Sequence, residues 1–226
     1  MQTESVLGVV SVNVGLPRTV EWRGQLVSTS ILKEPVERRV IVRRLNLDGD
    51  RQADLSVHGG PDKAVYAYPS EHYPYWREQL PDMDVQWAAF GENLTTTGLL
   101  EETVNVGDRF RVGSAVLAAV QPRTPCYKLG IRFGRADMVR LFHRGGRSGI
   151  YFAVEEEGEV AAGDPIVLLE RAMDSLSIAD ISRLYSARTD EGDASGKNVA
   201  LMRRAVALEA LPAGWRDYFV EQLARR

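Results

Sequence analysis

Short runs of apolar residues alternate with turn residues over the first two thirds of the chain. β-branched residues dominate from Val6 to Val14 and from Val40 to Leu45, with Gly or Asp-Gly punctuating each run. A further apolar stretch from Val104 to Val120 is interrupted at Gly107-Asp108 and at Gly113-Ser114. Such runs are typical of strands joined by turns. Many short strands at intervals of roughly ten residues indicate a closed barrel or a sandwich.

The pattern Val-x-x-Gly-Asp occurs twice, at Val104 to Asp108 and at Val160 to Asp164. Each copy stands just before another apolar, β-rich stretch. Gly and Asp supply the backbone conformations that tight turns require. We therefore interpret both copies as turns that open strands, rather than as sites of chemistry.

The hydrophobic period changes after Arg171. Apolar residues then recur at helical spacing in three segments, the first of which follows a Ser177-x-x-Asp180 sequence that resembles a capping box. The residues that carry this pattern are Ile178, Ile181, Leu184, Tyr185, Val199, Met202, Val206, Trp215, Tyr218, Phe219 and Leu223. The sequence predicts a mainly β domain over residues 1–172 and a three-helix subdomain over residues 173–226.

Charge and composition exclude several classes of partner. The formal net charge of −3 provides no general attraction for nucleic acid or for an anionic membrane. In the predicted helices, arginines alternate with acidic residues as on a solvated face, which argues against DNA binding. The N-terminal segment does not resemble a signal peptide, and no segment approaches the roughly 18 apolar residues of a membrane span. We expect a cytoplasmic protein.

Cys126 is the single cysteine of the chain and lies in the segment QPRTPCYKLG. Arg123 and Lys128 flank it, and cationic neighbours lower the pKa of a partly exposed thiol. Pro122 and Pro125 place it on a rigid loop at the end of a strand. A strand terminator without function would explain both prolines but not the two cations around the thiol. One cysteine also excludes an internal disulfide and a self-contained iron–sulfur cluster.

Two further segments are candidates for binding. His58, Gly59 and Gly60, followed by Lys63, combine an imidazole, permissive backbone and an ammonium group, which suit an anion or a polar heterocycle. A glycine turn with a structural histidine explains the same residues. Glu92-Asn93, after a glycine, could hydrogen-bond a heterocycle or cap a turn.

Other chemistries find little support in the sequence. Three widely spaced histidines and one cysteine do not make a zinc site. The motifs of nucleotide-binding loops and of the serine-hydrolase elbow are missing. A nucleophilic pair of Cys126 with His58 remains open, because residues that are distant in sequence can be neighbours in the fold.

Several segments in order resemble the MOSC domain, specifically its YiiM-type branch. They are TSILKEPV, DRQADLSVHGGPDKAVYAYPSEHY, FGENLTTTGL, VGDRF, QPRTPCYKLGIRF and RSGIYFAVEEEGEVAAGD, which together span about residues 29 to 164. The helical C-terminal region resembles the three-helix unit that closes YiiM-type chains. The resemblance implies a closed MOSC-type β-barrel with a small C-terminal three-helix subdomain.

The resemblance also implies a cofactor site. MOSC domains are associated with the molybdenum cofactor, and the motif cysteine that ligates molybdenum corresponds to Cys126. Because the pterin dithiolene supplies two more sulfurs, one thiolate is enough. Lys33 corresponds by order to a lysine that contacts the cofactor phosphate in amidoxime-reducing relatives. The further residues expected around the cofactor are Lys63, Arg123, Lys128, Glu92, Asn93, His58, Gly59 and Gly60.

Three hypotheses about function follow from this resemblance. In the first, the protein reduces N-hydroxylated compounds, such as hydroxylaminopurine-type bases, hydroxylamines and amidoximes, with electrons from a separate reductase and protons from His58 or solvent. In the second, it is a non-catalytic carrier of the cofactor, or of sulfur as a Cys126 persulfide. In the third, the helical region docks a partner or forms a homodimer.

Overall fold

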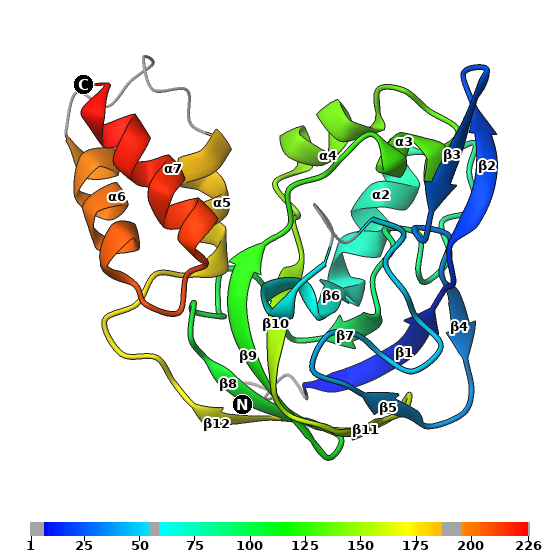
Figure 1. Cartoon of the computed structure of the whole chain (residues 1–226), viewed down its shortest axis with the longest axis horizontal. Helices are drawn as coiled ribbons and strands as arrows, with labels where there is room; N and C mark the ends of the chain where they lie inside the picture. The colour runs from blue at the N-terminus through cyan, green and yellow to red at the C-terminus, as the bar shows by residue number, and fades with distance from the viewer. Residues whose placement is uncertain (1–6, 55–58, 187–195, 226) are drawn as a thin grey trace.

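An eight-stranded mixed sheet organises the chain (Figure 1), and the computed structural model describes residues 7–54, 59–186 and 196–225. Neighbouring strands are antiparallel except for β6 and β7, which are parallel. The order across the sheet is β12 (Ile166–Glu170), β8 (Arg109–Val112), β9 (Ala115–Pro122), β10 (Ile150–Glu156), β6 (Val65–Pro69), β7 (Leu94–Thr97), β1 (Gly8–Val14) and β4 (Glu34–Val36). Two smaller sheets pair β11 (Gly158–Val160) with β5 (Val40–Val42), and β2 (Arg18–Trp22) with β3 (Gln25–Thr29).

Three short helices lie together beside the sheet (Figure 1). They are α2 (Tyr73–Gln79), which belongs to the crossover between the parallel strands, and α3 (Lys128–Phe133) and α4 (Met138–Gly145), which connect β9 to β10. Their apolar residues form a second buried cluster with β6, distinct from the main core. Its largest fully buried members are Trp76, Tyr68, Tyr73, Phe90 and Phe142. This cluster supports the region in which β9 ends.

Three helices form a small C-terminal subdomain, as predicted. They are α5 (Ile178–Ser186), α6 (Lys197–Ala207) and α7 (Ala213–Ala224). The predicted capping box is present, because the Asp180 amide donates to Ser177 Oγ at 3.0 Å and the Ser177 amide donates to Asp180 Oδ2 at 3.2 Å. Apolar residues of this subdomain, such as Leu184 and Phe219, belong to the same buried cluster as the sheet. The helices are therefore packed against the sheet.

The prediction of a mainly β, closed barrel was wrong. The sheet is mixed, and within the described residues no ladder joins its outer strands, β12 and β4. An isolated bridge between Gly8 and Pro165 brings β12 close to β1 without closing the sheet. Strand spacing misled the interpretation, because α2, α3 and α4 are only six to eight residues long. Helices of two turns show too little hydrophobic periodicity to be recognised.

The two Val-x-x-Gly-Asp segments are turns, as predicted. Asp108 Oδ2 accepts a hydrogen bond from the Asn105 amide at 2.8 Å, and Asp164 Oδ2 accepts one from the Ala161 amide at 2.9 Å. The glycine before each Asp has a positive φ, 91° at Gly107 and 88° at Gly163. Strands β8 and β12 begin within two residues of these turns. In the described part of the chain, no helix has the length and apolar character to cross a membrane.

Candidate functional site

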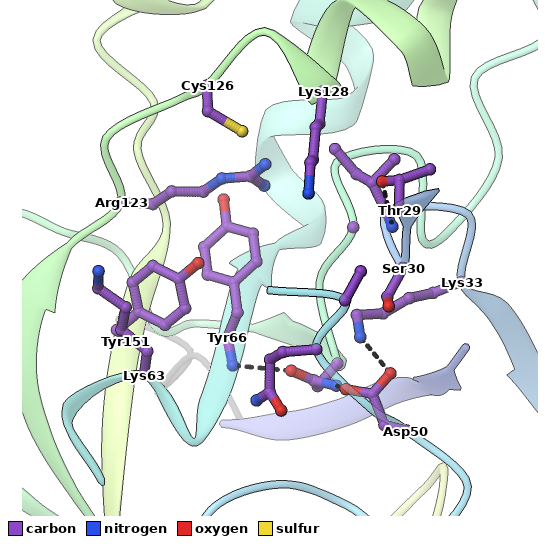
Figure 2. A pocket seen from close by; sticks show the side chains of 15 residues that line it. Thr29, Ser30, Lys33, Asp50, Lys63, Tyr66, Arg123, Cys126, Lys128 and Tyr151 are labelled. Atoms are coloured by element: carbon purple, nitrogen blue, oxygen red, sulfur yellow. Dashed lines mark hydrogen bonds and ion pairs between the residues drawn. The ribbon is translucent and has the colours of Figure 1, made fainter. Parts of the chain in front are cut away.

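An open pocket lies where the β9–α3 loop faces the segments that follow β3 and β5 (Figure 2). Its empty volume is about 600 Å³ when the part open to solvent is counted, within the range of roughly 300 to 1,000 Å³ of small-molecule sites. The lining residues are Thr29, Ser30, Ile31, Lys33, Asp50, Gln52, Ala53, Lys63, Tyr66, Gly91, Asn93, Arg123, Cys126, Lys128 and Tyr151. Five of the lining residues, Lys33, Lys63, Arg123, Cys126 and Lys128, are those that the sequence analysis selected for a thiolate and an anion.

Cys126 lies on the loop between β9 and α3, as the two prolines that precede it predict. β9 ends at Pro122, and the Cys126 carbonyl accepts a hydrogen bond from the Leu129 amide at 2.9 Å as α3 begins. Its side chain is partly exposed, and Figure 2 shows it directed into the pocket together with Arg123 and Lys128. The loop therefore presents a thiol between two cationic groups.

Lys33 and Asp50 form a buried ion pair on the other side of the pocket. Lys33 is 8% exposed and Asp50 is 6% exposed. Asp50 also accepts hydrogen bonds from the Gly15 amide at 2.9 Å and from Asn93 Nδ2 at 2.8 Å. Burial lowers the pKa of Lys33 below its ordinary value, and the Asp50 carboxylate opposes that shift. This carboxylate thus fixes the position of Lys33 and favours its charged form.

Arg123 is buried against a wall of two tyrosines. Its guanidinium carbon lies 4.7 Å from the centroid of the Tyr66 ring, and Nη1 donates to the Phe90 carbonyl. Tyr66 donates to the Ser148 carbonyl at 2.8 Å, and the rings of Tyr66 and Tyr151 are 5.0 Å apart. Burial raises the pKa of both phenols above the usual value, so both are neutral at pH 7. The cation is held in place by an aromatic ring rather than by a carboxylate.

The Ser30 hydroxyl is a buried polar atom that lines the pocket without a hydrogen-bond partner among the described residues. Buried polar groups are seldom left unsatisfied in proteins. Its position beside the cationic side chains makes it a candidate donor to a bound anion.

The structure places the other predicted residues differently. Asn93 lines the pocket, but its side chain is engaged with the Tyr66 amide and with Asp50. Glu92 is fully buried and accepts hydrogen bonds from the amides of Ala88 and Phe90 and from the Thr95 hydroxyl, outside the pocket lining. It stabilises the loop behind the pocket.

The two glycines of the predicted turn do not line the Cys126 pocket. Gly59 and Gly60 line a second hollow, and Lys63 lines both spaces. His58 lies outside the described residues, so its predicted roles and its pairing with Cys126 stay predictions.

Sequence reasoning missed Asp50, Tyr66, Tyr151 and Ser30. Asp50 was not selected, since nothing in the local sequence links it to Lys33. Tyr66 and Tyr151 belong to the largely apolar strands β6 and β10, where an aromatic residue is typical of packing. Their shared location depends on the pairing of β6 with β10, in which Tyr66 is opposite Tyr151.

The donor set of the pocket suits a soft metal ion that carries an anionic group. It offers one thiol, four cationic side chains and one unsatisfied hydroxyl. No group of three or more His, Cys, Asp or Glu residues that could hold a metal occurs among the described residues. A metal at this site would therefore need ligands from a cofactor in addition to Cys126.

Positive charge is concentrated in the segment that forms this side of the pocket. Residues 123–147, which include α3 and α4, contain seven Lys or Arg residues and one Asp. Their net charge is therefore +6, whereas the whole chain carries −3 and the remainder −9. Arg140 and Arg144 are exposed on α4.

Comparisons with known proteins agree with this geometry. The MOSC domain matches residues 54–167, and the YiiM-like 3-alpha helix domain matches residues 176–226. The uncharacterized protein YflK of Bacillus subtilis is 43% identical over 217 residues, which cover 96% of this chain and 95% of that protein. A protein of Gibberella moniliformis named Reductase is 37% identical over 168 residues, which cover 73% of this chain and 30% of that protein.

A solved structure has the same fold over nearly the whole chain. The crystal structure of YiiM from Geobacillus stearothermophilus has a TM-score of 0.78 and 37% sequence identity. The match covers 96% of this chain and 99% of that one.

Proposed function

This chain belongs to the MOSC family, which is associated with molybdenum cofactor binding, and we propose that it is a molybdenum-cofactor-dependent reductase of N-hydroxylated compounds. The observation that carries the proposal is the pocket, which gathers the single thiol and four cationic side chains around one space.

Cys126 would supply the one protein ligand to the metal. A thiolate is a soft ligand that suits a metal already bound by two pterin sulfurs. Lys33, Lys63, Arg123 and Lys128 would hold the anionic part of the cofactor by charge-assisted hydrogen bonds, and Ser30 would add a neutral one. In this arrangement the cationic groups would bind the anionic part of the cofactor, and the Cys126 thiol would bind the metal.

Reduction of an N–OH group consumes two electrons and two protons and yields an amine and water. The cofactor, when bound, would supply the electron pair. The neutral phenol of Tyr151 lines the pocket, and its hydroxyl makes no hydrogen bond with the described part of the chain. It can therefore donate a hydrogen bond to the oxygen that leaves.

The electrons must come from another protein. The chain has one cysteine, too few for an iron–sulfur cluster, and no motif for a flavin or a nicotinamide. The relative named Reductase supports a reductive role, and the match covers 30% of its length. We therefore expect a separate reductase to act on this protein.

The test compares wild type with Cys126→Ala and Cys126→Ser, produced in a host that makes the cofactor. Molybdenum and pterin are measured per chain, and reduction of N-hydroxylated substrates is followed with a chemical electron donor. We expect wild type to bind about one molybdenum per chain and both variants to lose turnover by at least about 100-fold, since even groups that merely orient a metal ligand contribute roughly 10- to 100-fold. Tyr127→Phe is the control, because Tyr127 is exposed on the same loop and does not line the pocket.

The outcomes separate the two main hypotheses. Full reductase activity in Cys126→Ala, with cofactor content unchanged, would contradict the proposal. Stoichiometric cofactor or sulfur bound through Cys126, without turnover, would instead show a carrier.

A further inference from the structure

A second hollow lies between the C-terminal helices and the sheet, where α5 and α7 approach the end of β9 (Figure 1). Its empty volume is about 1,040 Å³ when the part open to solvent is counted. We call it the aromatic cleft. The lining residues are Gly59, Gly60, Pro61, Asp62, Lys63, Gln121, Thr124, Tyr185, Pro212, Gly214, Trp215 and Tyr218.

Three aromatic side chains of the helical subdomain form one wall of the cleft. The Tyr185 ring lies 5.2 Å from the Trp215 ring and 5.2 Å from the Tyr218 ring, measured between centroids. Tyr185 is 38% exposed, so these rings are not simply part of the core. Their exposed faces can contact a ligand.

A hydrogen-bonded chain fixes this wall to the sheet. Trp215 Nε1 donates to Gln121 Oε1 at 2.6 Å, and Gln121 Nε2 donates to the Asp62 carbonyl at 2.7 Å. The orientation of the indole is therefore set before any ligand binds, which lowers the entropy cost of binding.

The remaining lining is polar or small. Lys63, Asp62 and Thr124 contribute charged and hydroxyl groups, and Gly60 and Gly214 contribute backbone. A Cβ added at either glycine would meet no atom within 4 Å. Space for a ligand thus remains against the backbone at both positions.

The aromatic cleft adjoins the Cys126 pocket. Lys63 lines both. The β9–α3 loop separates them, because Gln121 and Thr124 line the cleft while Arg123 and Cys126 line the pocket. A molecule in the cleft that reaches toward the thiol must therefore pass Lys63.

We propose that the aromatic cleft binds a planar heteroaromatic ring of the substrate, with its N-hydroxyl group directed past Lys63 toward Cys126. Aromatic side chains bind flat rings by stacking, without requiring one pattern of hydrogen bonds. The polar lining suits the ring nitrogens and exocyclic groups of such a ring. This inference rests on the proposed function, and it assigns substrate selection to the helical subdomain.

The first test fills the cleft from Gly214. Gly214→Leu projects a side chain into the open space, and Gly214→Ala is the matched control; both residues are good helix formers at this position in α7. For 6-hydroxylaminopurine we expect Gly214→Leu to raise KM about tenfold, which is the effect of losing one stacked ring. For hydroxylamine, which has no ring, we expect KM to be unchanged in both variants, with molybdenum content also unchanged.

The second test needs no turnover. The fluorescent base 2-aminopurine is titrated with metal-free wild type and with both variants. Saturable quenching by wild type and Gly214→Ala, and weaker binding to Gly214→Leu, is the expected result. This arm separates the two proposals: ring binding without any reduction would contradict the proposed function and leave the cleft assignment intact. Equal KM effects on both substrates, or the same 2-aminopurine affinity in all three proteins, would overturn the cleft assignment.

Discussion

The Cys126 pocket and the aromatic cleft lie on either side of one loop, but different interactions position their lining side chains. The pocket depends on buried charges, since Lys33, Asp50 and Arg123 are each less than 10% exposed. The cleft depends on ring contacts and on the hydrogen bond from Trp215 to Gln121. Charged groups removed from water are strongly coupled to their partners. The comparison shows that buried charges fix the groups of the pocket, whereas ring packing and one hydrogen bond fix those of the cleft.

Removing one charge of the buried pair gives the largest expected effect. In Asp50→Asn, Lys33 loses its counter-charge. Asn93 Nδ2, which donates to the Asp50 carboxylate in the wild type, would face an amide group instead. We expect the free energy of unfolding to fall by about 3 to 5 kcal/mol, measured by denaturant unfolding. Asp48→Asn is the control, because solvent screens the exposed Asp48–Arg43 pair and its loss should change the free energy of unfolding far less. Equal losses of unfolding free energy in the two variants would contradict the view that buried charges stabilise the pocket.

Removing the indole hydrogen bond gives a smaller expected effect. Trp215→Phe leaves Gln121 Oε1 without its donor. We expect a loss of about 1 kcal/mol, seen as a decrease in Tm of roughly 2 to 4 °C for a chain of this size. Tyr218→Phe on the same helix removes a hydroxyl that makes no hydrogen bond with the described residues, and should leave Tm unchanged. If Trp215→Phe were as damaging as Asp50→Asn, the two regions would not differ as described.

The smallest expected effect concerns pH at the edge of the cleft. The His143 ring faces Tyr185 at 6.5 Å, and partial burial lowers the pKa of His143 below 6.5. Because the unfolded chain then binds the proton more readily, the contribution of His143 is complete above pH 6.5 and is lost as pH falls through the lower folded-state value. Because solvent screens this exposed side chain, we expect its titration to change Tm by at most about 1 °C.

The measurement is the change in Tm between pH 7.5 and pH 5.5. His143→Gln should show a smaller decrease than wild type, because it removes this titration. A larger decrease in the variant would mean that the pKa of His143 is raised rather than lowered.

The sequence predicts the parts of the fold that depend on local pattern. The C-terminal helices, the Ser177–Asp180 cap and the two Asp turns each follow from residues within a few positions of one another. The topology of the sheet could not be predicted in this way. The parallel pairing of β6 with β7 and the open edges depend on contacts between distant segments.

The same limit applies to the pocket. The thiol and its cationic neighbours belong to one short segment, and the resemblance added Lys33. Asp50 stabilises Lys33 from a position 17 residues away. Glu92 illustrates the converse, since its polar character invited a binding role, whereas its oxygens are occupied by neighbouring amides. Local sequence shows which groups are reactive, and the fold determines which remain available.

The uneven distribution of charge has a kinetic consequence. With +6 on residues 123–147 and −9 on the rest, the molecule has a locally positive region around the loop that carries Cys126. In the field of an anionic protein surface such a molecule rotates during approach, so that encounters occur with the pocket side first. Collisions with an acidic electron donor would then be oriented before contact, and their rate would fall as salt shortens the range of the field.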